Sequence, residues 1–342
     1  PLVVYVPQKL KNVSPFPIGS STDKFISFID LSATVLNLAG IKIPKTIDGK
    51  PFLGNNASNK VAENEVTFGY ADRFDEKYDM VRSVRKGNLK YIRNFQPFNV
   101  DGLMNNYRYK QLAYKEWKQL FDDKKLNATQ SLFFEPKLPE EIYDLEKDPY
   151  ETNNLVTNSA FSKELKQLRE CLNSWIKKMP DLSFYPEHYL IDNAFSNPIE
   201  FGEANKKNIS RYLKISNLQL LPFSKAEPKL LKLLKSSDEI TRYWALIVCT
   251  SFGEKAASLS NEINQIMISD SYLLNKMRAA EFLGILGIQD TSKEMLTLLY
   301  ESDNATESLL ILNSMVLQKD FYKKNSFIIK TNKLNKKLRE HE

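Results

Sequence analysis

The chain has 342 residues, of which 42% are hydrophobic and 26% are charged, and its net charge is +6. This composition is typical of a folded globular protein, and the length suffices for two or three domains. The apolar runs are far shorter than the roughly 20 residues of a membrane-spanning helix, so a membrane span is excluded. The positive charge collects in residues 319–342, which predict a basic tail.

Cysteine and histidine are scarce. Cys171 and Cys249 lie far apart in helical patterns, so we expect two buried thiols, with one disulfide as the alternative. His188 and His341 are too few for a histidine-rich metal site or for a histidine-based catalytic triad within this chain.

The first segment is apolar. PLVVYVP, residues 1–7, places five apolar side chains between two prolines, which predicts a buried strand with neighbours on both sides. Such a strand indicates that the sequence begins within a domain. A helix follows from Asp30, its expected N-cap, to Gly40, which supplies the positive φ at its C-terminal end. The pair Asp48-Gly49 then marks a turn in a surface loop.

Strand patterns follow over residues 66–95. VRSVR and LKYIRNF flank the turn at Lys86-Gly87-Asn88 and predict a hairpin. Residues 107–123 predict a helix, and EEIYDL at 140–145 predicts a further strand. Pro149 ends that strand, because proline cannot donate a hydrogen bond to a ladder.

Helical patterns dominate the remainder. An amphipathic helix is predicted from one apolar stripe: Leu165, Leu168, Leu172, Trp175 and Ile176. Farther on, the dipeptide Ser-Asp recurs at spacings of 32 and 33 residues, beginning at Ser237, Ser269 and Ser302, with apolar helical patterns on both sides. A two-helix unit at this period predicts an α-solenoid of HEAT-like repeats.

Four segments resemble, in order, parts of the type I sulfatases of the alkaline phosphatase superfamily: PLVVYVP, ISFIDLSATVLNLAGIKIPKTIDGKPFLG, VRSVRKGNLKYIRNF and EEIYDLEKDPYETNNL. YADRFDEKYDMVRSVRKGNLKYIRNF, FFEPKLPEEIYDL and FYPEHY are most similar to the heparan N-sulfatase (sulfamidase) branch, especially its bacterial members. The sequence departs from the family at Ala33-Thr34, where the family helix usually has Pro-Thr. Proline near a helix start is dispensable, so the expected fold is unchanged.

The resemblance implies an α/β fold of the sulfatase/alkaline phosphatase type. This chain would hold its C-terminal part, namely the last strands of the mixed sheet with a small antiparallel sheet and a helix, followed by an all-α HEAT-like solenoid. The predicted parts are the end of the α/β core at 1–65, the C-terminal subdomain at 66–180, a linker at 181–214, the HEAT-like repeats at 215–318 and the basic tail at 319–342.

The resemblance also implies a chemistry. Such an enzyme attacks sulfate with a hydrated formylglycine, made in a Cys/Ser-x-Pro/Ala-x-Arg sequence, and binds calcium through oxygen ligands. Neither Cys171, followed by LNSW, nor Cys249, followed by TSFG, matches that sequence. The resemblance thus implies that the nucleophile and the calcium ligands precede Pro1, that this chain has no catalytic or metal-binding residue, and that alone it is inactive.

The segment ADRFDEKYD is the candidate for contact with substrate. Four of its charged residues, Asp72, Arg73, Asp75 and Glu76, lie between two strands, in a loop that resembles the family's substrate-facing position. Arg73 can bind a sulfate or carboxylate bidentately, and Asp72 can accept hydrogen bonds from sugar hydroxyls. The alternative is a solvated charged turn.

Other residues favour structural roles. Arg82 is expected to pair within the sheet, and Tyr243 and Trp244 are expected in the core of the solenoid. Glu187 and His188 could line the rim of the pocket, although a lone histidine is more often structural.

The expected function is hydrolysis of sulfate esters or N-sulfate groups on a sugar derived from a polysaccharide or glycosaminoglycan. The expected partner is therefore a sulfated sugar or glycan and not a nucleic acid, and the resemblance implies a periplasmic or secreted enzyme. Two alternatives remain open. One is a phosphodiesterase or phosphonate hydrolase of the same superfamily, and the other is a non-catalytic scaffold whose HEAT-like repeats bind a protein or glycan.

Overall fold

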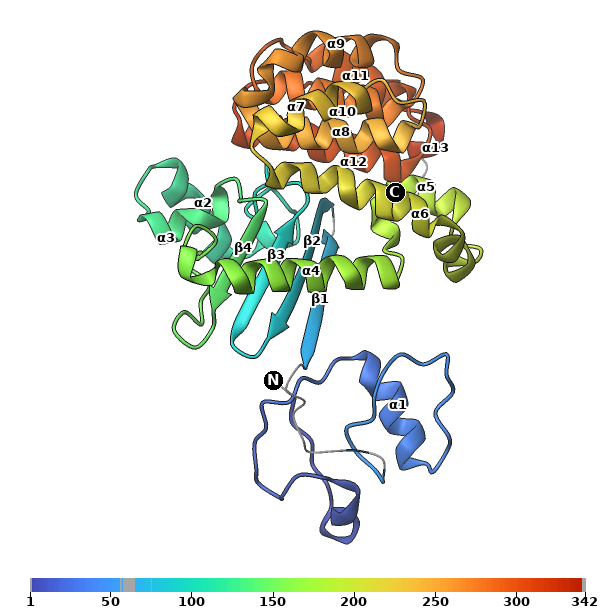
Figure 1. The fold of residues 1–342 in the computed structure, drawn as a ribbon. Coiled ribbons are helices and arrows are strands. Elements are labelled where there is room, and N and C mark those ends of the chain that lie inside the picture. The colour runs from blue at the N-terminus through green and yellow to red at the C-terminus, as the bar shows by residue number, and fades with distance from the viewer. Residues whose placement is uncertain (1, 56, 58–64, 75, 340–342) are drawn as a thin grey trace. The chain divides into compact units, whose positions relative to one another are not determined.

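The computed structural model describes residues 2–55, 57, 65–74 and 76–339 (Figure 1). The chain divides into two units. The smaller unit comprises residues 1–68 and 84–90, and the larger unit comprises residues 69–83 and 91–342.

The smaller unit is mostly irregular. It contains a short 3₁₀ helix, Gln8–Val13, and helix α1, Ile29–Leu38. The prediction of a buried strand at residues 1–7 is wrong for the described residues 2–7, which form no strand. Val3 and Tyr5 are 91% and 86% exposed. The physical reason is that no strand in the described part of the chain pairs with this segment, and a lone extended segment cannot satisfy its backbone groups.

Asp30 anchors α1 in a way that differs from the prediction. Phe28 occupies the N-cap position, and Asp30 lies in the first turn. Its carboxylate accepts hydrogen bonds from the backbone N–H groups of Ser27 and Lys50, both at 2.8 Å. Asp30 therefore fixes the approach to the helix and holds the following loop against it. Gly40, with φ of +71°, ends the helix as predicted.

The four strands form a small antiparallel sheet in the order β1-β2-β3-β4. The strands are β1, Val66–Phe74; β2, Lys77–Lys86; β3, Leu89–Asn94; and β4, Glu140–Asp144. The predicted hairpin is confirmed as β2 and β3, with Gly87 at φ of +55° in the turn. The strand predicted from EEIYDL is confirmed as β4.

The turn after β4 is closed by side chains. The Oδ1 atom of Asn154 accepts hydrogen bonds from the backbone N–H groups of Ile142 and Val156, at 3.1 and 3.0 Å. Asp148 accepts from the backbone N–H groups of Thr152 and Asn153, at 3.1 and 2.8 Å. These bonds satisfy backbone groups where the ladder ends, so the motif has a structural role in this turn.

Helices of the larger unit accompany the sheet: α2, Leu112–Asp122; α3, Ala128–Ser131; α4, Ser162–Lys178; α5, Glu187–Asn193; and α6, Pro198–Ser216. The amphipathic helix is confirmed as α4, where Leu168, Leu172 and Ile176 are buried. Arg169 of this helix binds Glu140 of β4 through two hydrogen bonds of 2.8 and 2.6 Å.

The remaining helices are α7, Phe223–Leu233; α8, Glu239–Phe252; α9, Ser260–Ser269; α10, Leu273–Ile285; α11, Ser292–Glu301; α12, Ala305–Val316; and α13, Lys336–Arg339. A π-helical turn, Leu317–Phe321, extends α12. Helix α8 packs on α6, α7 and α10, and α10 also packs on α9, α11 and α12 (Figure 1). The HEAT-like character of these helices and the domain boundaries stay predictions. The expected linker at 181–214 contains α5 and most of α6.

Side chains join the helices of the larger unit to its sheet. Gln219 donates to the backbone oxygen of Phe95 at 2.9 Å, and Arg93 donates to the backbone oxygen of Ser216 at 2.9 Å. Tyr322 Oη donates to the backbone oxygen of Phe98 at 3.0 Å. Each bond joins segments more than a hundred residues apart, so the helices and the sheet of this unit share one buried polar framework.

The core of the larger unit is centred on Trp244, which is 1% exposed. Its ring packs on those of Phe95, Phe184 and Tyr243, with centroids at 6.0, 5.1 and 6.2 Å. Its indole N–H donates to the backbone oxygen of Phe184 at 2.8 Å. The prediction that Tyr243 and Trp244 are core residues is confirmed for their burial.

Cys171 and Cys249 form no disulfide, as predicted. Cys249 is buried, and burial raises the pKa of its thiol, whereas Cys171 is only partly buried rather than fully buried as expected. Among the described residues, none of the helices has the length and apolar character needed to cross a membrane.

The three Ser-Asp pairs have different roles. Asp238 is the N-cap of α8 and accepts a hydrogen bond of 2.8 Å from the backbone N–H of the third helical residue. Asp270 instead binds Arg242, and Asn304 rather than Asp303 caps α12.

We expect Asp238→Ala to lower the free energy of unfolding by about 1 kcal/mol, because it removes the acceptor for an orphan N–H group of α8. Urea unfolding followed by far-UV circular dichroism measures the change. The matched control is Asp303→Ala, which removes a carboxylate that caps no helix and whose partner Lys337 has a side chain 71% exposed. Equal losses in the two variants would contradict the assigned cap.

Candidate functional site

Asp72, predicted to contact substrate, lies near the end of β1 and is paired with protein groups. Its carboxylate accepts hydrogen bonds from Nη1 and Nη2 of Arg82 at 2.9 and 3.2 Å. It also accepts from Oγ of Ser183 at 3.0 Å. Burial raises the pKa of the Asp72 carboxyl, against the opposing effect of Arg82.

Arg82, on β2, bridges two carboxylates. Besides Asp72 it binds Asp181, with Nε–Oδ2 at 2.7 Å and Nη2–Oδ1 at 3.0 Å. Its side chain is 2% exposed, and those of Asp72 and Asp181 are 25% and 12% exposed. Burial disfavours the charged form of Arg82, but Asp181 and then Asp72 outweigh it and raise its pKa. The predicted pairing within the sheet is confirmed, and Asp181 adds a second partner.

Arg73 is also held by an acidic side chain. Nε donates to Oε1 of Glu187 at 2.7 Å, and Nη2 contacts the other carboxylate oxygen. Nη1 donates to the backbone oxygen of Glu76 at 2.9 Å. The two side chains of the ion pair are 21% and 22% exposed, so this pair lies at the surface of the larger unit.

Glu76 closes the turn between β1 and β2. Its carboxylate accepts hydrogen bonds of 2.9 Å from Nδ2 of Asn105 and from the backbone N–H of Asn106. Asn313 of α12 donates to the backbone oxygen of Glu76 and accepts from the backbone N–H of Tyr78 at 2.7 Å. Asp75 lies outside the described residues.

Three of the four predicted site residues therefore gather at one end of the β1–β2 hairpin. Each of the three is engaged with protein groups and together they form a charge network, while their role in contact with substrate stays a prediction. The partners Asp181, Ser183 and Glu187 were missed by the sequence analysis as members of this network. Only Glu187 had a signal, the segment FYPEHY, about a hundred residues away in sequence, and Asp181 and Ser183 lie just before that segment.

His188 lies on α5. Its Nε2 atom is 3.1 Å from Oη of Tyr272 and 3.9 Å from a carboxylate oxygen of Glu307. Burial lowers the pKa of His188 and raises that of Glu307. The neutral ring bonded to Tyr272 fits the structural role expected for this histidine.

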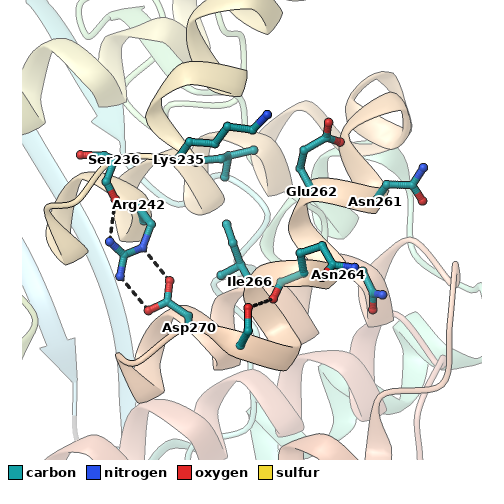
Figure 2. Close-up of a pocket in the computed structure, with 11 residues that line it drawn as sticks. Lys235, Ser236, Arg242, Asn261, Glu262, Asn264, Ile266 and Asp270 are labelled. Carbon is teal, nitrogen blue, oxygen red and sulfur yellow. Dashed lines mark hydrogen bonds and ion pairs between the residues drawn. The ribbon is translucent and has the colours of Figure 1, made fainter.

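A second candidate site is an open hollow of about 540 Å³ beside α9 (Figure 2). Arg242 turns toward Asp270 and binds it with hydrogen bonds of 2.6 and 2.8 Å, and its Nη1 donates to the backbone oxygen of Ser236 at 2.7 Å. Burial opposes the charged form of Asp270, but the effects of Arg242, of the backbone N–H of Tyr272 and of Asn275 together outweigh it and lower the pKa of that carboxyl. Lys235 and Glu262 also line the hollow and lie apart from this pair. The sequence analysis did not identify this hollow.

The residues of the hairpin network do not fit the expected calcium ion. Calcium binds sets of uncompensated oxygen ligands, whereas Asp72 and Asp181 share the guanidinium of Arg82 and Glu187 binds Arg73. Among the described residues, no group of three or more His, Cys, Asp or Glu side chains is arranged to hold a metal ion.

No protein-family model matches the chain. The chain is 32% identical over 197 residues to an ulvan-active sulfatase of Formosa agariphila, a match that covers 57% of this chain and 32% of that protein. A second ulvan-active sulfatase of the same organism is 27% identical over 191 residues, covering 55% and 34%. The chain thus spans about a third of the length of the curated relatives that it matches. These matches show distant homology to sulfatases over about half of the chain.

Among solved structures, the chain is similar to that of BT4656 in complex with its substrate D-glucosamine-2-N,6-O-disulfate. The identity is 18% and the TM-score is 0.29, over 45% of this chain and 24% of that one. A likeness this weak carries no argument about the fold or the substrate.

Proposed function

We propose that this chain is the C-terminal portion of a sulfatase that removes sulfate from a sulfated sugar. The observation that carries the proposal is the 32% identity over 197 residues to an ulvan-active sulfatase. The failure of residues 2–7 to form the expected strand removes one structural support, so the proposal rests on the sequence homology.

The finer parts of the proposal come from the motifs of the sequence. The nucleophile, a formylglycine, and the calcium ligands are placed in a portion that precedes Pro1, since no residue set described above fits them. The enzyme is placed in the periplasm or outside the cell. Helices α7 to α12 are assigned to HEAT-like repeats. The heparan N-sulfatase-like motifs favour a polysaccharide or glycosaminoglycan-derived sugar with an ester or an N-linked sulfate.

Within this enzyme, the chain would supply the support and one wall of the substrate pocket. The buried bridge of Arg82 fixes the hairpin to Asp181, and this connection holds the surface pair of Arg73 and Glu187 in place. An anionic group of the substrate would bind Arg73 by displacing Glu187, because Nε and Nη2 of the guanidinium already donate to that carboxylate.

The test is an assay of the protein encoded by the gene extended upstream of Pro1. Sulfate release is measured from ulvan oligosaccharides and from N-sulfated glucosamine, and mass spectrometry looks for formylglycine. Sulfate release that is lost when the modified cysteine or serine is replaced with alanine supports the proposal. Hydrolysis of bis(p-nitrophenyl) phosphate without sulfate release would favour the phosphodiesterase alternative. If both activities are absent and no Cys/Ser-x-Pro/Ala-x-Arg sequence lies upstream, the result would favour the non-catalytic scaffold.

We expect Arg73→Ala in that longer enzyme to raise KM for a sulfated oligosaccharide about tenfold, because a charge-assisted bidentate contact is lost. The stability should fall by at most about 1 kcal/mol, since the ion pair lies at the surface. The matched variant Glu187→Gln breaks the same pair but keeps the guanidinium, so its KM should change less. Unchanged KM and turnover in Arg73→Ala would reject a role of Arg73 in substrate binding.

A further inference from the structure

Helix α9 is flanked by two hollows in the helical part of the larger unit. The first is the one shown in Figure 2, of about 540 Å³, and the second has a volume of about 430 Å³ and is bordered by α9, α10 and α11. Asn264 lines both of them. The two hollows therefore share one lining residue of α9, and we refer to the pair of hollows as the groove of α9.

Five polar side chains of the first hollow have no side-chain partner in the part of the chain that the structure describes. In the first hollow, Lys235, Asn261, Glu262, Asn264 and Gln265 make no side-chain hydrogen bond or ion pair with any described residue. Three of these five carry an amide, which donates and accepts at once. The groove thus presents hydrogen-bond donors and acceptors side by side along a short segment of α9.

The second hollow adds an acceptor that is shielded from water. Oε2 of Glu294 is buried and has no hydrogen-bond donor among the described residues. Buried carboxylate oxygens are normally bonded, because leaving one unsatisfied costs free energy. The residue as a whole is only partly buried and lines the hollow, so a turn of its carboxyl group would bring this oxygen to a ligand hydroxyl.

The charges of the groove are balanced. Lys235 faces the same hollow as Glu262, and the second hollow is lined by two lysines, Lys276 and Lys293, and two glutamates. A dense polyanion would meet the carboxylates of three glutamates here, besides Asp270, which is paired with Arg242, and this argues against a polyanion. A ligand rich in hydroxyls, with an occasional anionic group for the lysines, fits better.

Apolar side chains complete the lining. Leu234 and Ile266 belong to the first hollow, and Ile268 and Leu298 to the second. Ligand sites commonly combine such apolar surface with a few placed polar groups. A sugar ring, with hydroxyls at its edge and C–H groups on its faces, has this combination of chemistry.

We propose that the groove of α9 binds an oligosaccharide. Asn264, which lines both hollows, donates to and accepts from ring hydroxyls, Glu294 accepts a hydroxyl proton in the second hollow, and Lys235 binds an anionic substituent at the rim. This site lies on the helices and is separate from the charge network of the β1–β2 hairpin. That the oligosaccharide comes from a sulfated glycan rests on the proposed function. That the site binds a saccharide does not rest on it.

The test uses the whole 342-residue chain and isothermal titration calorimetry. The probes are an ulvan oligosaccharide of defined length, the same oligosaccharide after chemical desulfation, and inorganic polyphosphate. We expect both saccharides to bind, the desulfated one at most about tenfold more weakly, and no binding of polyphosphate in the groove. Each lost hydrogen bond weakens binding several-fold. The double variant Asn264→Ala, Gln265→Ala should therefore bind both saccharides at least about tenfold more weakly.

The matched control is Asn173→Ala, at an asparagine of α4 outside both hollows, which should leave the affinity unchanged. Should the double variant fail to fold, Gln265→Ala alone replaces it, since this side chain is exposed. Absence of saccharide binding, equal affinity in the double variant, or binding of polyphosphate alone would overturn the proposal. Saccharide binding here together with no sulfate release from the longer enzyme would reject the proposed function and leave this site standing.

Discussion

Replacing Arg82 with methionine is expected to lower the free energy of unfolding of the larger unit by about 3–5 kcal/mol. The side chain is 2% exposed and binds Asp72 and Asp181 together. Methionine keeps much of the volume but removes the charge, so two carboxylates stay close together with no cation between them. Guanidinium unfolding followed by far-UV circular dichroism measures the loss. Because the chain has two units, the transition assigned to the larger unit must be resolved first.

The control for Arg82→Met shows whether the loss of stability depends on the burial of the ion pair or only on the pairing itself. Arg169→Met breaks the ion pair of Arg169 with Glu140, which also has two hydrogen bonds to one carboxylate, but this arginine is 30% exposed, so we expect a loss of at most about 1 kcal/mol. Adding Asp72→Asn and Asp181→Asn to Arg82→Met should recover part of the lost stability, since the uncompensated charges are then gone. A loss below about 1 kcal/mol in Arg82→Met, or no recovery in the triple variant, would show that the bridge does not stabilise the fold.

Replacing Trp244 with alanine is expected to destabilise the larger unit by about 3–5 kcal/mol. The indole is 1% exposed and packs on three aromatic rings, so its removal leaves a cavity among Phe95, Phe184 and Tyr243. The backbone oxygen of Phe184 also loses its donor. The same guanidinium unfolding experiment measures the loss. Far-UV circular dichroism is used because the variant lacks the tryptophan whose fluorescence would otherwise report unfolding.

Trp244→Phe is the control for this site. It keeps an aromatic ring in the core and removes the N–H donor and part of the volume, so we expect a loss of about 1–2 kcal/mol. If the alanine and phenylalanine variants lose the same amount, the hydrogen bond to Phe184 rather than the packing dominates. If neither loses stability, Trp244 is not a core residue.

The elements that follow from local chemistry could be predicted from the sequence. The hairpin of β2 and β3 was predicted because Gly87 permits the positive φ of the turn. Helix α4 was predicted because its apolar side chains repeat at helical spacing, and three of them are buried. In both cases the deciding interactions lie within a few residues in sequence.

Features that depend on distant partners could not be predicted in this way. Residues 1–7 have the composition of a buried strand, yet a strand requires neighbours that the described chain does not supply. Arg73 was expected to face a ligand, and its partner Glu187 lies 114 residues away in sequence. The sequence pattern identified the charged positions near the end of β1, but the network that Asp72 and Arg73 form depends on the tertiary fold.

The hydrogen bonds from Gln219 to Phe95 and from Arg93 to Ser216 have a consequence for how the helices could be reused. Helices cut away from this sheet would lose these bonds and the packing of Trp244 on Phe95, which follows β3, so they do not constitute a cassette that could be grafted intact onto another protein. Their amide protons should exchange with deuterated solvent together with those of β3, in one cooperative opening rather than two.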